Sequence, residues 1–212
     1  MRGDGVWVYD EDALGYLDAV NNVTHVEHAN PWVAAAAHCQ MQRLNTNSRF
    51  VYDGIARYAE RLVGLLPAPL GVVFLVCTGS EANDLALRIA RQVTGREHVL
   101  VIDGAYHGGT SAVTGICPNR YRGPGGAGPP PTTHEVVRPD RYRGPYGYAD
   151  AAAGSRYADD VRDMVASLAA ADTPPAAFFA ESLMGTAGTV LLPEGYLREG
   201  FAAVRAAGGL CV

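Results

Sequence analysis

The sequence predicts an α/β protein built on a mainly parallel sheet with helices on both faces. From residue 72 onward, short apolar runs alternate with longer segments that repeat apolar residues at helical spacing. Strands that alternate with helices favour a parallel sheet, because each parallel pair needs a long crossover connection that a helix supplies. Polar or glycine-rich turns follow three of the apolar runs, as in sheets that bind ligands at the carboxyl ends of their strands.

Before residue 72 the sequence predicts a β-hairpin and two helices. The hairpin strands are 6–9 and 16–20, around an acidic turn. Pro31 suits the first position of a helix that runs to residue 44. The second helix, 53–66, has apolar residues at helical spacing and ends before Pro67.

The second part of the chain supplies the strands of the sheet. The predicted strands are 72–76, 98–102, 135–137 and 176–180, with another starting at 209–212. The predicted helices between them are 81–94, 157–170 and 196–207, and Gly95 suits the end of the first of these. Irregular stretches rich in Gly and Pro occupy 117–131 and 138–155.

Composition narrows the class of protein. The 212 residues are 48% hydrophobic and 18% charged, which is typical of a globular chain. A net charge of −5 argues against a broad nucleic-acid surface, although the pentapeptide R-Y-R-G-P occurs at both 120–124 and 141–145. No apolar run is long enough to span a bilayer, and the charged N-terminus does not resemble a secretion signal. We therefore expect a soluble, cytoplasmic protein that binds neither nucleic acid nor membrane.

The four cysteines are not spaced as metal ligands. They are Cys39, Cys77, Cys117 and Cys211. Reduced thiols in a cytosolic protein account for this pattern, so we expect no metal site.

The junction at residues 77–81 predicts an anion site. An apolar run ends there in C-T-G-S and a helix begins at Glu81. The first backbone N–H groups of a helix have no intrahelical partner, and the helix dipole favours negative charge at that end. Gly79 lets the backbone approach a bound group closely, and the Ser80 hydroxyl adds a donor. Phosphate, sulfate or carboxylate are the expected ligands.

Two further polar clusters follow strands. Tyr106 and His107 come after the strand 98–102, and Glu181 comes after the strand 176–180. Because the carboxyl ends of parallel strands share one edge of the sheet, we expect these residues on the same edge as the anion site.

Several motifs resemble the class III aminotransferases, which are pyridoxal-phosphate enzymes of fold type I. Residues 78–88, T-G-S-E-A-N-D-L-A-L-R, are similar to the family's cofactor-phosphate motif. Residues 103–108, D-G-A-Y-H-G, resemble its aromatic turn, and 177–181, A-F-F-A-E, resemble its next strand and acidic residue. Residues 16–18 and 21–23 resemble its N-terminal segment.

The resemblance implies a cofactor-binding role for five residues, and each also has a simpler interpretation. Gly79 and Ser80 would hold the phosphate of pyridoxal 5′-phosphate, or merely form a tight turn. Tyr106 would lie over the pyridine ring, or be a core aromatic. His107 would neighbour that ring, or be a structural histidine. Glu181 would face the cofactor or substrate, or be a surface carboxylate.

The resemblance also implies a domain organisation and a partner. Residues 1–45 would be an N-terminal segment of the small domain, and 46–212 a large cofactor-binding domain truncated at its C-terminal end. The family's members are homodimers that act on small amino substrates. This chain departs from the family pattern at Gly109, Ser182 and Met184, which affects the expected substrate contacts more than the expected fold.

The chain carries no lysine, since all 17 of its Lys and Arg residues are arginine. The family's chemistry needs a Schiff-base lysine that binds the cofactor aldehyde and moves the substrate proton. No residue of the chain is therefore assigned a catalytic role. We expect the chain to be an N-terminal fragment of a longer, active enzyme. Alone, the fragment should be inactive and poorly soluble.

Three functions remain open. The first is transamination between an amino donor and a keto acid. The second is a phospho-lyase that eliminates phosphate from an amino-alcohol phosphate, since 44–50, L-N-T-N-S-R-F, and 142–144, Y-R-G, resemble that subgroup. Arg49 and Arg143 could then bind a substrate phosphate or carboxylate, or be surface residues. The third is a non-catalytic remnant.

Overall fold

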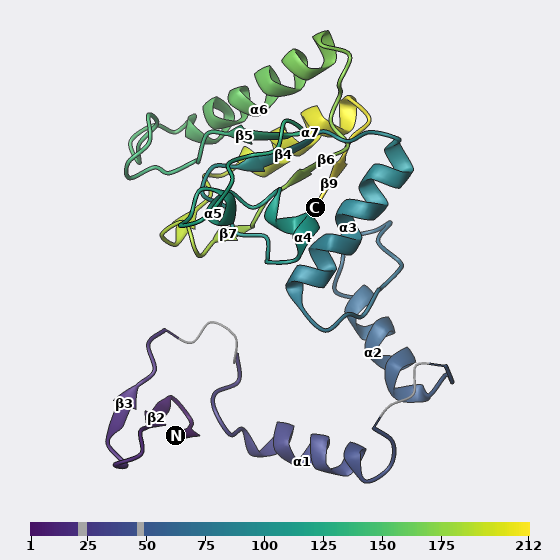
Figure 1. Ribbon diagram of the computed structural model, residues 1–212, viewed down its shortest axis with the longest axis vertical. Helices are drawn as coiled ribbons and strands as arrows, with labels where there is room; N and C mark the ends of the chain where they lie inside the picture. The colour runs from purple at the N-terminus through teal and green to yellow at the C-terminus, as the bar shows by residue number, and fades with distance from the viewer. Residues whose placement is uncertain (21–24, 46–48) are drawn as a thin grey trace. The chain divides into compact units, whose positions relative to one another are not determined.

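The computed structural model describes residues 1–20, 25–45 and 49–212. They divide into two compact units, 1–73 and 74–212, which Figure 1 shows by colour along the chain. The predicted boundary between residues 45 and 46 concerns the small and large domains of the family and stays a prediction. Residues 21–23, and residues 46–48 of the L-N-T-N-S-R-F motif, lie outside the described residues.

The first unit contains a small antiparallel sheet and two helices. Strands β1 (Arg2–Asp4), β2 (Trp7–Tyr9) and β3 (Gly15–Leu17) pair in that order. The hairpin turn is held by Asp10, whose carboxylate accepts from the N–H groups of Asp12 and Leu14. Helices α1 (Pro31–Met41) and α2 (Asp53–Val63) follow, and neither has a buried residue. The hairpin and both helices were predicted, but β1 was not.

The second unit is organised around a four-stranded, wholly parallel sheet. Its strand order is β5 (Thr133–Val136), β4 (Val99–Ile102), β6 (Ala177–Phe179) and β9 (Leu210–Cys211). Helix α3 (Gly79–Thr94) precedes β4, α6 (Ala153–Ala170) joins β5 to β6, and α7 (Tyr196–Ala206) precedes β9. Two short helices, α4 (Ser111–Thr114) and α5 (Pro118–Tyr121), and the hairpin β7 (Leu183–Met184) with β8 (Val190–Leu191) complete it.

Alternate residues of the central strands supply two separate cores, as the side-chain period of a strand requires. Leu100 and Phe178 face the core formed with α6 and α7. Val101 and Phe179 face the core formed with α3 and α4. Figure 1 shows the helices on either side of the sheet. The α/β class and the helices on both faces are therefore as predicted.

The predicted strand 72–76 is wrong. No strand is assigned there, and its side chains Val72, Phe74, Leu75 and Val76 are exposed by 43–78%. A strand requires a hydrogen-bonded neighbour, and the described residues provide none for this segment. The apolar run is nevertheless positioned directly before α3, as the sequence indicated.

Candidate functional site

The N-terminus of α3 begins with a complete capping box. The Thr78 hydroxyl accepts the N–H of Glu81 at 3.1 Å, and Glu81 Oε2 accepts the N–H groups of Cys77 and Thr78 at 2.8 and 2.9 Å. These bonds fix where the helix starts and hold the preceding backbone in place. The helix therefore presents its first turn in a defined position.

Two donors of that first turn are left over. Among the described residues, no hydrogen bond is formed by the N–H groups of Gly79 and Ser80. A Cβ added at Gly79 would meet no atom within 4 Å, so space is open beside it. Unpaired N–H groups next to open space at a helix N-terminus suit an anion.

The turn that follows β4 lies directly against this end of the helix. The N–H of Gly109 donates to Ser80 Oγ at 3.1 Å. Asn83 Nδ2 donates to the His107 carbonyl at 2.8 Å. Because Ser80 Oγ accepts from Gly109, its own hydrogen stays available to donate to a ligand.

Two more contacts join the same elements. The Thr110 hydroxyl donates to Asp84 Oδ2 at 2.7 Å. Gly108 has a φ of 133°, and a Cβ there would lie 2.6 Å from Ser80 Oγ. Only glycine allows this approach, so the helix and the turn form one packed unit.

Tyr106 and Glu181 are connected across neighbouring strand ends. The N–H of Tyr106 donates to Glu181 Oε1 at 2.8 Å. Both residues line a pocket of about 380 Å³ together with Asn83 and His107. The Arg120 guanidinium lies 5.2 Å from the centre of the Tyr106 ring. The Glu181 carboxylate thus both lines the pocket and fixes the backbone that carries Tyr106.

His107 is a buried, neutral histidine. Its side chain packs edge-on against Phe179, and its N–H donates to Cys117 Sγ at 3.2 Å. Burial lowers the pKa of His107 to about 4, because charge is unfavourable away from water. Its Nε2 is buried without a hydrogen-bond partner among the described residues. An unpaired buried polar atom in a residue that lines a pocket can form a hydrogen bond with a ligand.

The structure therefore brings the sequence-predicted residues together in two adjoining groups. Gly79 and Ser80 are at the helix end, while Tyr106, His107 and Glu181 line the pocket beside it. Free N–H donors, a hydroxyl and an aromatic side chain fit a phosphate attached to a flat ring. The five residues are thus a set that could hold pyridoxal phosphate, and the role of each stays a prediction.

Sequence reasoning missed Asn83 and Asp84, whose side chains join the helix to the turn. They stand three and four residues after Ser80, which was predicted, so all three share one face of α3. The helical spacing of these residues is visible in the sequence, but only the fold shows that they contact the turn after β4. Cys117, which had been assigned no site role, contacts the His107 backbone.

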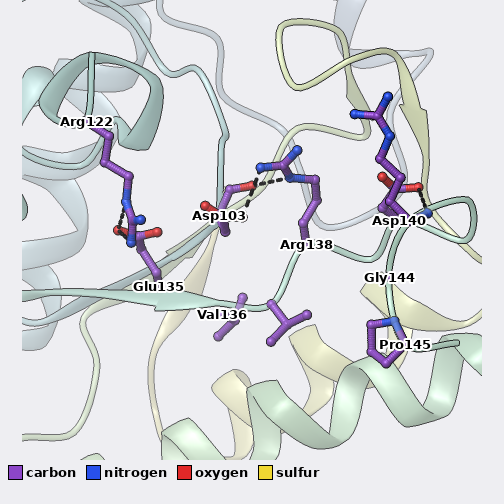
Figure 2. A pocket seen from close by; sticks show the side chains of 10 residues that line it. Asp103, Arg122, Glu135, Val136, Arg138, Asp140, Gly144 and Pro145 are labelled. Atoms are coloured by element: carbon purple, nitrogen blue, oxygen red, sulfur yellow. Dashed lines mark hydrogen bonds and ion pairs between the residues drawn. The ribbon is translucent and has the colours of Figure 1, made fainter. Parts of the chain in front are cut away.

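Arg143 is part of a different pocket. Figure 2 shows this cavity of about 450 Å³, in which Arg122 pairs with Glu135 and Arg138 pairs with Asp103. No carboxylate of the described residues lies within ion-pair distance of the Arg143 guanidinium. This cavity shares no lining residue with the Tyr106 pocket.

The two R-Y-R-G-P copies supply Arg122 and Arg143 to that cavity. Their glycines have a packing explanation. A Cβ at Gly144 would lie 2.2 Å from the Tyr157 hydroxyl, and one at Gly123 would lie 2.9 Å from the Asn119 carbonyl. Arg49 lies in the first unit, whereas Arg143 lies in the second. No described helix is long and apolar enough to cross a membrane.

Comparison with known proteins identifies relatives of the whole chain. Residues 1–208 match the family model for class III aminotransferases. The chain is 41% identical to an alanine–glyoxylate aminotransferase 2-like protein of Drosophila melanogaster, over 100% of this chain and 44% of that protein. The chain therefore spans less than half the length of this relative.

Solved structures agree. A phospholyase from Arthrobacter in complex with phosphoethanolamine superposes with a TM-score of 0.87 at 37% identity, covering 100% of this chain and 49% of that one. An omega transaminase from Pseudomonas jessenii in complex with PMP gives a TM-score of 0.87 at 25% identity, with the same coverage. The fold is that of the fold type I, pyridoxal-phosphate-dependent transaminases, and the chain belongs to the class III aminotransferase family.

Proposed function

We propose that this chain forms the phosphate-binding and ring-binding part of a pyridoxal-phosphate-dependent aminotransferase. Such an enzyme transfers an amino group between an amino donor and a keto acid. The proposal rests mainly on one observation, the direct contact between Ser80 and the turn that carries Tyr106 and His107. The family match supports it.

Each residue has a distinct part in the proposal. The N–H groups of Gly79 and Ser80 and the Ser80 hydroxyl bind the cofactor phosphate. Tyr106 packs on the ring, and Glu181 holds the backbone of Tyr106 in place. His107 stays uncharged at neutral pH, so it adds no positive charge to the pocket. Bound pyridoxal phosphate supplies the electron sink that stabilises negative charge on the substrate carbon.

These 212 residues alone lack a group that the reaction needs. The chain has no lysine, so no side-chain amine can bind the cofactor aldehyde. We propose that the activity belongs to a longer product that contains this chain and supplies the lysine. This chain covers only 44–49% of the length of the two relatives compared above, which supports a longer product.

Non-covalent binding of the amine form, pyridoxamine phosphate, tests the site within the chain. Calorimetry should show binding to the parent chain and weaker binding to Ser80→Ala. The matched control is Ser111→Ala, an exposed serine at the start of α4, which should bind as the parent does. Equal affinity of all three proteins would show that Ser80 does not hold the phosphate.

A phospho-lyase acting on an amino-alcohol phosphate is the second candidate. The Arthrobacter phospholyase is 37% identical to this chain, compared with 25% for the Pseudomonas jessenii transaminase. A longer product would be assayed with phosphoethanolamine. Release of inorganic phosphate without a keto acid would favour the lyase, whereas amino transfer that depends on a keto acid would favour the transaminase.

The homodimer belongs to the same proposal. Helix α1 exposes Trp32, Val33 and Met41 by 57–84%, which is unusual for large apolar side chains on a monomer surface. Sedimentation of the longer product should therefore give twice the mass of one chain. A monomer at micromolar concentration would contradict the dimer.

A further inference from the structure

A pair of histidines lies at the opposite end of the strands from Tyr106. His98 immediately precedes β4, and His134 is the second residue of β5. Nδ1 of His98 and Nε2 of His134 are 2.8 Å apart. Neither residue has a part in the proposed cofactor site.

The register of the sheet explains why the two side chains meet. Leu100 of β4 pairs with His134 of β5. Side chains alternate along a strand, so His98, two residues before Leu100, faces the same side as His134. The two are diagonal neighbours on one face, within reach for long side chains. Both are partly exposed, so solvent and ions have access to them.

The rings meet edge to edge in nearly one plane. Their planes are 14° apart and their centres 5.1 Å apart. Rings packed face to face would keep their atoms about 3.5–4.0 Å apart. The shorter 2.8 Å separation of the two nitrogens is that of an N–H···N hydrogen bond, in which one ring donates and the other accepts.

We propose that His98 and His134 together form a binding site for a divalent transition-metal ion such as Zn²⁺. The ion would take the place of the shared hydrogen, with both facing nitrogens as ligands. The ring that had donated moves its proton to its other nitrogen, so both rings remain neutral and no proton is lost. Neutral imidazole is a good ligand for zinc, nickel and copper ions.

Metal binding needs a change in both the separation and the orientation of the rings. With Zn–N bonds of about 2.0–2.1 Å and tetrahedral angles, two ligand nitrogens lie about 3.3 Å apart. The nitrogens must therefore move about 0.5 Å apart, from 2.8 Å, and each ring must turn by about 35° so that its lone pair points at the ion. Among the described residues no group of three or more His, Cys, Asp or Glu could hold a metal, so water completes the coordination. Affinity should follow the usual order, with copper the tightest.

Zinc titration of the chain labelled with nitrogen-15 in its six histidines tests the site directly. The purification tag is removed, and the exposed thiols are excluded as ligands by Cys39→Ser and Cys77→Ser. The ring nitrogens of His98 and His134 should shift together, at the lowest zinc concentration that affects any histidine. Earlier shifts at the Asp18-bound His28, or no shift of the pair at millimolar zinc, would overturn the proposal.

Substitution provides the second measurement. Losing a group that only orients a metal ligand already costs about 10–100-fold in metal affinity, so His134→Gln, which removes a ligand itself, should lose at least about tenfold. His38→Gln, an exposed histidine on α1, is the matched control and should keep the parent affinity. Equal affinity of His134→Gln and its parent would contradict the proposal. If His134→Gln fails to fold, the zinc titration of the chain that keeps both histidines still tests the proposal.

Discussion

At the residue scale, Gly108 controls how closely the aromatic turn approaches the helix. Its φ of 133° belongs to a region that side chains rarely adopt. The neighbouring Gly109 does not have a positive φ, and a Cβ there would meet no atom within 4 Å. The two adjacent glycines therefore form a natural pair of test and control.

Gly108→Ala should destabilise the protein and weaken phosphate binding. A Cβ 2.6 Å from Ser80 Oγ and 2.8 Å from Ser80 Cα forces the turn away from α3. The expected loss in free energy of unfolding is about 1–3 kcal/mol. Urea denaturation measures it, with Gly109→Ala expected within about 0.5 kcal/mol of the parent. Two alanine variants of equal stability would refute the close contact.

His107 should make stability depend on pH. Its folded pKa of about 4 is below the ordinary 6.5, so on acidification the unfolded state takes up the proton first. Stability is therefore highest above about pH 6.5 and falls as the pH drops towards 4, by about 3 kcal/mol in total. Denaturation at about pH 7 and pH 4.5 measures the change, which His107→Gln should reduce. An unchanged pH dependence in the variant would argue against a buried, neutral His107.

At the element scale, the capping box determines where α3 starts. Thr78→Ala removes the acceptor for the N–H of Glu81 and should cost about 1 kcal/mol of unfolding free energy. Ser167→Ala, an exposed position inside α6, is the control and should be neutral or slightly stabilising. Urea denaturation compares them, and equal stabilities would mean that the cap is dispensable.

The elements that could be predicted are those whose signals are local. Helix α3 is bounded by Thr78 and by Gly95, which adopts the left-handed conformation at φ 68°, and the sequence marked both ends closely. The strand predicted at 72–76 depends on a neighbouring strand that the run itself does not encode. The short helix α5 lies inside a stretch whose Gly and Pro content indicated only a loop.

The candidate site was predictable to the same extent. Strand ends and helix starts placed Ser80, Tyr106 and Glu181 on one edge of the sheet, because parallel strands end together. The bonds from Asn83 to His107 and from Glu181 to the Tyr106 N–H were not predictable. They depend on the path of a turn 24 residues or more from their partners in sequence.

At the scale of the whole molecule, the unpaired apolar segment 72–76 has a consequence for solubility. Exposed apolar side chains in a contiguous run favour association between molecules. Replacing Val72 and Phe74 by Asp should lower concentration-dependent light scattering. Leu191→Asp, which alters an apolar side chain of β8 that is 73% exposed, is the control and should change it less. Equal effects would locate the association elsewhere.

The hydrogen bonds between α3 and the turn after β4 also couple the two parts of the site that would bind the phosphate and the ring of a ligand. Ser80 touches both the open helix end and the backbone next to His107, so ordering one orders the other. A group held only at the helix end thereby pre-organises the aromatic end, and the second contact forms at a smaller entropic cost. We expect phosphate and ring to bind with positive cooperativity, each strengthening the other beyond the sum of the separate pieces.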